Sequence, residues 1–122
     1  MLGLTGATRI YLYRGAADLR CGFDGLSGLV RTHLHQDPLC GSLFVFTNRR
    51  RTLVKILCWA GDGFWIWQMR LEQGTFRLPQ GSAGSAQIDR RTLAMLLEGI
   101  TPRRLSRRYR HGEARPAVAA GA

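Results

Sequence analysis

The segment from Leu43 to Leu78 constrains the fold more than any other part of the chain, because its β-branched and aromatic residues come in short runs that turn signals close. It also holds all three tryptophans and the only lysine of the chain. Short apolar runs separated by turn residues are typical of strands joined by hairpins. The segment therefore predicts an antiparallel meander of about four strands.

Two turn signals predict how these strands pair. Asp62-Gly63 suits a two-residue type I′ loop, which needs positive φ at both central residues, and Gln73-Gly74 is a weaker signal of the same length. Both registers gather apolar side chains on one face of three strands, as a sheet that buries one side requires. The predicted pairs are Ala60–Trp65, Cys58–Trp67, Ile56–Met69, Val54–Leu71, Leu71–Phe76 and Met69–Leu78.

The opposite face of this predicted sheet is basic. In the same registers Lys55 lies across from Arg70, and Arg70 lies across from Arg77, with Trp59 beside them. Like charges directly opposite each other destabilise a sheet, so the row is either neutralised, splayed into solvent or offered to an anion. Trp59 is then placed to stack on a base, although an aromatic residue is by default part of the core. The loop that leads into this sheet adds Arg49, Arg50 and Arg51.

Composition agrees with an anionic partner. The 122 residues carry a net charge of +10 and a pI near 11.2, and 17 of the 18 basic residues are arginine, whose planar fork suits phosphate oxygens. Hydrophobic content of 45% is that of a globular protein. Three cysteines without a CxxC spacing disfavour a disulfide framework and a zinc site. With no signal peptide or membrane span in the sequence, we predict a soluble, cytoplasmic protein.

Helices are predicted on both sides of the meander. Apolar residues at helical spacing indicate a helix over about 24–36, after a short strand at 9–13. Asp89 is a suitable N-cap for a second helix over 89–98, which follows a connector at 79–86. We therefore predict an α+β fold: an antiparallel sheet of four to five strands flanked by two helices, in one domain over residues 1–101.

Residues 102–122 are predicted to form a disordered, basic tail. An arginine run of this kind binds polyanions through counterion release and carries no sequence information. Specific recognition would then have to come from the sheet face or from the Arg49–Arg51 loop. The tail arginines assigned to nucleic-acid binding are Arg103, Arg104, Arg107, Arg108 and Arg110.

Nothing in the sequence gives a positive reason to expect an enzyme. A metal-dependent nuclease needs carboxylates that converge on Mg²⁺, and the candidates here are Asp18, Asp24, Asp62 and Glu72. Asp62 is explained by its turn, Asp24 by its helix start and Glu72 by its cationic neighbours. We therefore predict no catalytic residue, no metal site and no cofactor.

Several motifs occur in an order that resembles a known family. They are Asp18-Leu-Arg20 with Gly22-Phe23-Asp24-Gly25-Leu26, Phe44-Val45-Phe46 with Asn48-Arg49-Arg50-Arg51, Lys55-Ile56-Leu57 with Trp59, Gly63-Phe64, Arg70-Leu71-Glu72 with Gly74 and Phe76, and Leu93 through Gly99. Over residues 8–101 the chain resembles the TnpB-type (Orf2-like) accessory protein of the insertion-sequence-66 family of bacterial transposons, which is distinct from the RNA-guided nuclease that shares the name. Ala60 and Met69 depart from the family pattern, where an acidic residue and a lysine are common.

The resemblance implies a role in transposition beside a DDE-type transposase and a second accessory protein, and hence a bacterial, nucleoid-associated protein. Together with the basic surface, it leads to the hypothesis of a non-catalytic accessory protein that binds DNA and helps to assemble the transposase. The alternative is a module that docks an acidic surface of the transposase without touching DNA. A nuclease is the third hypothesis.

Overall fold

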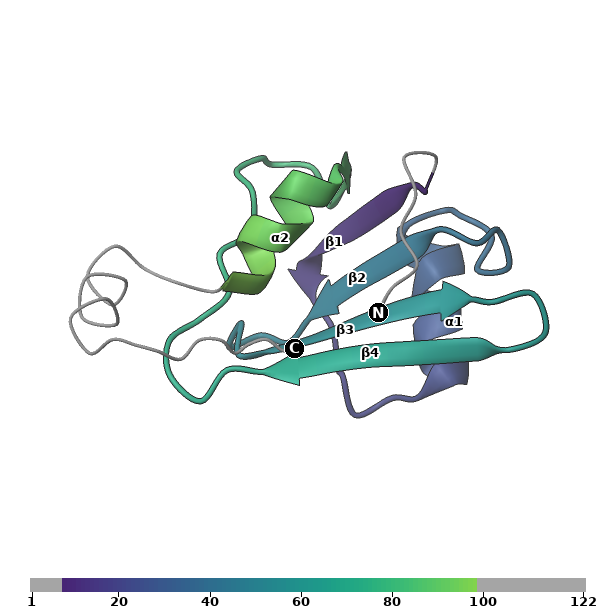
Figure 1. The fold of residues 1–122 in the computed structure, drawn as a ribbon, viewed down its shortest axis with the longest axis horizontal. Coiled ribbons are helices and arrows are strands. Elements are labelled where there is room, and N and C mark those ends of the chain that lie inside the picture. The colour runs from purple at the N-terminus through teal and green to yellow at the C-terminus, as the bar shows by residue number, and fades with distance from the viewer. Residues whose placement is uncertain (1–7, 99–122) are drawn as a thin grey trace.

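The computed structural model describes residues 8–98 as one sheet and two helices (Figure 1). The elements follow in the order β1 (Ile10–Ala16), α1 (Phe23–His33), β2 (Leu43–Thr47), β3 (Leu53–Trp59), β4 (Phe64–Arg70), β5 (Ser85–Ile88) and α2 (Arg90–Glu98). The prediction of an α+β fold with two helices is confirmed. None of the described helices is long and apolar enough to cross a membrane.

The sheet is mixed, and here the prediction of a purely antiparallel sheet is wrong. The strand order is β4-β3-β2-β1-β5, and β1 runs parallel to β2 while the other neighbours are antiparallel. The reason is that α1 lies between β1 and β2 in the chain. A connection that contains a helix brings the second strand back in the same direction as the first.

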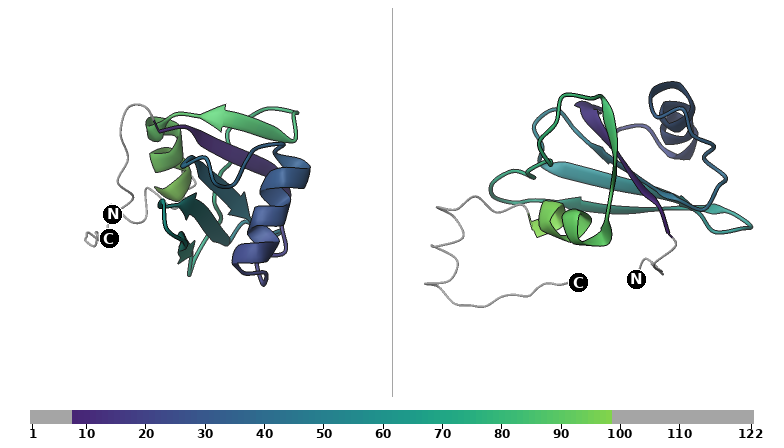
Figure 2. Two further views of the ribbon diagram at one scale, coloured as in Figure 1. Left: turned by 90° about the vertical axis from the view of Figure 1, so that its right-hand side faces the viewer. Right: turned by 90° about the horizontal axis from the view of Figure 1, so that it is seen from above.

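Both faces of the sheet are buried, which the prediction of one apolar and one basic face missed. Figure 2 shows the helices on opposite faces. We name the faces after the helix that covers them. The α2 face gathers Ile10, Leu12, Leu43, Val45, Val54, Ile56 and Cys58 with Phe76, Leu93 and Leu96. The α1 face gathers Phe44, Phe46 and Leu57 with Ala17, Leu19, Leu26, Val30 and Leu34.

The β3–β4 hairpin exists, but its register differs by two residues from the predicted one. Cys58 pairs with Trp65 rather than Trp67, and Ile56 pairs with Trp67. The connection is four residues long, from Ala60 to Gly63, and the Ala60 N–H donates to the Gly63 carbonyl at 2.8 Å. Because side chains alternate between faces with a period of two, a shift of two residues leaves each side chain on its predicted face.

The fifth strand lies elsewhere than the sequence suggested. Residues 71–84 contain no strand, so the predicted strand after Gln73-Gly74 is absent. Phe76 is buried in this loop, and its N–H donates to the Arg51 carbonyl at 2.7 Å. The strand β5 forms instead within the predicted connector and pairs with β1 at the other edge of the sheet. Its partner is more than 70 residues away, which no local pattern reveals.

The second helix begins as predicted. The Asp89 carboxylate accepts a hydrogen bond from the Thr92 N–H at 2.7 Å, which caps α2 and holds the pKa of Asp89 below its usual value. Leu93 and Leu96 then face the sheet, because residues three apart lie on one side of a helix. The helix ends at Glu98, which lies beside the loop that contains Arg77.

Candidate nucleic-acid interface

The predicted row of three cations across the sheet is not formed. Lys55 pairs with Gln68, and Arg70 lies opposite Leu53 at the end of the hairpin. Arg77 is in the loop after β4 and belongs to no strand. The half-buried Lys55 donates from Nζ to the Cys21 carbonyl at 3.3 Å, on the α1 face. A two-residue change of register keeps the faces but changes every cross-strand neighbour, and that separated Lys55 from Arg70.

Arg51 turns back into the protein. Its Nη2 donates to the Arg14 carbonyl at 2.7 Å, and its Nη1 donates to the Thr47 hydroxyl and, at 3.5 Å, to the Gly15 carbonyl. Its φ of 59° is unusual for a residue with a side chain. This backbone conformation aims the guanidinium at the ends of β1 and β2, where carbonyls converge. The side chain therefore joins two parallel strands.

Trp59 is half-buried and lies at the far end of the β3–β4 hairpin from Arg70. Its ring contacts the ring of Phe64 edge-on, with centroids 4.9 Å apart, and Phe64 in turn stacks against Phe23 at 6.5 Å. These three aromatic residues form a cluster between the hairpin and α1. Trp59 is thus separated from the arginines with which the sequence grouped it.

Four of the predicted arginines lie at one end of the sheet. Arg49 and Arg50 form the exposed turn between β2 and β3, Arg70 ends β4, and Arg77 follows in the next loop. The Leu71 N–H donates to the Thr52 carbonyl at 2.8 Å, so the segment after β4 runs beside this turn. This is the left-hand end of the sheet in Figure 1. We call Arg49, Arg50, Arg70 and Arg77 the basic end.

Asn48 holds the turn that presents two of these arginines. Its Oδ1 accepts from the N–H groups of Thr52 at 2.9 Å and Leu53 at 3.1 Å, and its Nδ2 donates to the Thr52 hydroxyl at 3.1 Å. Short polar side chains stabilise turns in this way. With both sides of the turn tied together, Arg49 and Arg50 project outward. This role of Asn48 was not predicted from the sequence, although an asparagine before a polar turn indicates such a role.

The basic end carries little compensating charge. Among the described residues the structure forms one ion pair, Asp18 with Arg20 at 2.9 Å, and it lies outside the basic end. The Arg20 guanidinium lowers the pKa of Asp18 from 3.8 to about 2. The carboxylates next to the basic end are Glu72 in the loop and Glu98 in the last turn of α2. The arrangement is an exposed, positive rim without a deep cleft.

The last turn of α2 adjoins Arg77. Together with Pro79 and Met95, Arg77 and Glu98 line an open hollow of about 430 Å³. The predicted tail arginines Arg103, Arg104, Arg107, Arg108 and Arg110 lie outside the described residues. Glu98, the last residue that the structure describes, lies beside the basic end.

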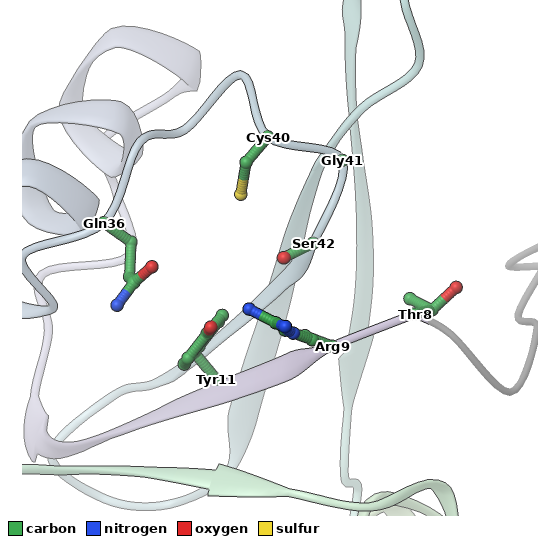
Figure 3. A pocket seen from close by; sticks show the side chains of 7 residues that line it. All are labelled: Thr8, Arg9, Tyr11, Gln36, Cys40, Gly41 and Ser42. Carbon is green, nitrogen blue, oxygen red and sulfur yellow. The ribbon is translucent and has the colours of Figure 1, made fainter.

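A second hollow lies at the other end of the sheet, where β1 and β2 begin. It measures about 450 Å³, and Figure 3 shows the side chains that surround it. The Tyr11 ring stacks on Phe44 at 5.7 Å. This hollow was not predicted from the sequence, because its residues come from separate segments that carry no motif. They are Thr8, Arg9, Tyr11, Gln36, Cys40, Gly41 and Ser42.

The candidate nuclease carboxylates do not gather. Asp62 is in the turn before β4 and Glu72 is in the loop after β4, so a whole strand separates them. Asp18 is bound by Arg20, and Asp24 lies in the first turn of α1. Within residues 8–98 no three His, Cys, Asp or Glu side chains are placed to hold a metal ion together.

Comparison with known proteins identifies the family. A family model described as "IS66 Orf2 like protein" matches residues 8–107. Two proteins of Sinorhizobium fredii (strain NBRC 101917 / NGR234) are similar over most of their length. "Uncharacterized protein y4hO" is 37% identical over 92 residues, covering 75% of this chain and 80% of that protein, and "Uncharacterized protein y4jC" is 31% identical over 108 residues, covering 88% and 92%. No solved structure matches the chain. The chain thus belongs to the IS66 Orf2-like family of accessory proteins in insertion-sequence transposition.

Proposed function

We propose that this accessory protein binds the phosphate backbone of DNA through its basic end, and continues the contact through the arginines beyond residue 102. The observation that carries the proposal is the convergence of Arg49, Arg50, Arg70 and Arg77, which three separate segments bring to one rim. Arginine suits this role because its planar guanidinium binds phosphate oxygens through two parallel hydrogen bonds.

The proposed contact is with the backbone and not with base edges. A rim of flexible, exposed side chains neutralises phosphates and positions a duplex, whereas sequence is read by groups that enter a groove. No described helix carries its arginines as a single row suited to the major groove. In this proposal the protein acts without catalysis of its own and contributes affinity, while a partner transposase contributes chemistry and sequence choice.

Salt dependence of binding to duplex DNA tests the proposal on the full chain. The slope of log K against log salt is negative, and each lost phosphate contact reduces its magnitude by about 0.9. We expect the variant with Arg49, Arg50, Arg70 and Arg77 all replaced by Gln to lose most of its affinity, and the magnitude of its slope to fall by up to about 3.6. The matched control replaces four exposed arginines outside the basic end, namely Arg9, Arg31, Arg90 and Arg91.

The control distinguishes binding at the basic end from attraction by the overall positive charge, because both variants lose the same net charge. If the two variants lose equal slope, only the overall charge matters and the basic end is not a binding site. A third variant, with Arg103, Arg104, Arg107, Arg108 and Arg110 replaced by Gln, measures the share of the tail. Binding that vanishes in this variant alone would reject a contact through the folded domain.

The hollow beside Arg77 favours a second candidate function, docking of an acidic surface of the transposase. Met95 is 64% exposed at this hollow, and Pro79 lines it, so apolar surface lies beside the guanidinium. Protein interfaces combine such apolar centres with charged rims. Replacement of Arg77 and Arg70 by Glu separates the two functions. Lost binding to the transposase with retained DNA affinity would favour docking.

A further inference from the structure

The outer edge of β4 carries backbone groups without a partner among residues 8–98. β4 is the last strand on its side of the sheet, and it is seven residues long, FWIWQMR. A long apolar edge strand usually pairs with another strand or is blocked by charges or proline. In β4 the only charged residue is Arg70, at its end. The opposite edge strand, β5, has only four residues.

The register of the hairpin shows which groups of β4 face outward. The Ala60 N–H bonds to the Gly63 carbonyl, and the Leu71 N–H bonds to the Thr52 carbonyl. In an antiparallel pair hydrogen-bonded residues alternate with residues whose backbone groups point away. The odd-numbered residues of β4 therefore bond to β3. The N–H and C=O groups of Phe64, Ile66, Gln68 and Arg70 point to the free edge.

The side chains of β4 on the α2 face are also incompletely covered. Trp65, Trp67 and Met69 pack against the core cluster of that face, yet each remains partly exposed. The two fully buried residues of α2, Leu93 and Leu96, belong to the same cluster. Figure 1 shows α2 at the upper left, beside β1 and away from the middle of β4. Two tryptophans at a strand edge are an apolar surface of the kind that marks an interface.

We propose that β4 pairs with β4 of a second copy of this chain, antiparallel and around a two-fold axis at Trp67. This register places Phe64 opposite Arg70 of the partner subunit, and Ile66 opposite Gln68 of the partner subunit. All four outward N–H groups and all four outward carbonyls then find partners. The two five-stranded sheets become one continuous sheet of ten strands.

Side chains fit the same register. The two copies of Trp67 face each other at a pair without hydrogen bonds, where cross-strand side chains are closest. Trp65 of each copy meets the other copy's Met69, so the half-exposed residues of both α2 faces form one cluster. On the α1 face, Arg70 arrives over Phe64, whose ring already contacts Trp59 and Phe23. A guanidinium over an aromatic face is favourable.

A second copy fits this edge better than a strand of unrelated sequence. The edge is self-complementary under a two-fold rotation, which is the common symmetry of soluble dimers. Antiparallel pairing also keeps the two Arg70 side chains at opposite ends of the joint, whereas parallel pairing would place them side by side. The two basic ends of the dimer then point in opposite directions, and each keeps Arg49, Arg50 and Arg77 outside the joint, while Arg70 lies at its border over Phe64 of the partner subunit.

Sedimentation equilibrium of the full chain tests the pairing. We expect twice the chain mass of 13.6 kDa. Gln68→Pro should halve the observed mass, because it removes an outward N–H and leaves the bonds to β3 in place. Gln68→Thr keeps that N–H and should remain dimeric. A monomeric wild type, or a dimeric Gln68→Pro with a normal circular dichroism spectrum, would overturn the proposal.

Disulfide crosslinking tests the register without relying on proline. In a background with Cys21→Ser, Cys40→Ser and Cys58→Ala, Trp67→Cys places two thiols across the axis at a separation that a disulfide spans. We expect oxidation to give a covalent dimer. Trp65→Cys is the matched control and should stay uncrosslinked, because it faces Met69 of the partner subunit. Crosslinking through Trp65→Cys and not through Trp67→Cys would overturn the axis at Trp67.

Discussion

Arg50 and Arg51 are neighbours in the sequence, and the structure uses them in opposite ways. Arg50 is exposed in the turn, whereas Arg51 donates to the backbone or hydroxyl oxygens of Arg14, Gly15 and Thr47. Arg14 resembles Arg51, because it donates to four carbonyls of the loop before and into β5. Neighbouring arginines in one run can therefore have different roles, one exposed to solvent and the next bonded to the backbone. A guanidinium with five donors serves as a structural crosslink wherever carbonyls converge.

The largest effect is expected from Arg51→Ala. The substitution leaves the Arg14 and Gly15 carbonyls and the Thr47 hydroxyl without this donor, and hydrogen bonds from a charged group contribute about 2 kcal/mol or more to stability. We expect a loss of roughly that size in the free energy of unfolding, measured by urea denaturation. The affinity for DNA of the protein that remains folded should be unchanged. If the Arg51→Ala variant were as stable as the wild type but bound DNA more weakly, Arg51 would have the same surface role as Arg50.

Arg51→Gly sharpens the same comparison. Glycine also lacks the guanidinium, but it tolerates the φ of 59° at this position, which costs a residue with a side chain about 1 kcal/mol. We therefore expect Arg51→Gly to be less destabilising than Arg51→Ala by roughly 1 kcal/mol. Equal unfolding free energies for the two variants would mean that the backbone conformation at this turn carries no strain.

A smaller effect is expected from Arg14→Met, which keeps the apolar stem and removes the donors. Its bonds to the carbonyls of Pro79, Gln80, Ala83 and Ser85 are 3.1 to 3.4 Å long and partly in contact with water. We expect a loss of about 1 kcal/mol in global stability. Amide hydrogen exchange should speed up in residues 79–85 and stay unchanged in β3. Uniform acceleration throughout the sheet would contradict a local role.

Arg49→Gln with Arg50→Gln should leave stability within about 0.5 kcal/mol, because exposed side chains without partners add little to folding. The same double variant should lose a slope of up to about 1.8 in log K against log salt if both side chains contact phosphates. Fluorescence anisotropy with a labelled duplex measures this slope. A change in thermal midpoint without a change in slope would assign these arginines to the fold and not to the surface.

The smallest effect concerns the exposed pair of Asp18 and Arg20. Because the pKa of Asp18 is lowered to about 2, the pair contributes to stability above the ordinary carboxyl pKa and this contribution is lost as pH falls through about 2. In the variant Arg20→Gln, NMR titration should return the pKa of Asp18 toward 3.8. An unchanged pKa in that variant would show that the backbone N–H, and not the guanidinium, lowers it.

Local patterns in the sequence predicted local structure well. The helix over α1 followed from apolar spacing, and the α2 start followed from Asp89, because caps and helical faces depend on residues a few positions apart. The side-chain faces of the β3–β4 hairpin were also correct, although its register was not. Alternation with a period of two specifies which face each side chain occupies. It does not specify the length of the loop between the strands, which sets the register. The predicted pairing of Lys55 with Arg70 failed for that reason, and Arg77 left the row because the strand predicted after Gln73-Gly74 does not form.

The sequence by itself determined the element types of most of the chain, its basic character and, through its motifs, its family. Only the tertiary structure decided that β1 lies parallel to β2, that β5 forms the far edge, and that Arg51 points inward while Arg49 and Arg50 point out. These outcomes depend on contacts between residues far apart in the chain. Such contacts are selected by burial of both faces of the sheet and by the need to satisfy backbone carbonyls, which no local pattern encodes.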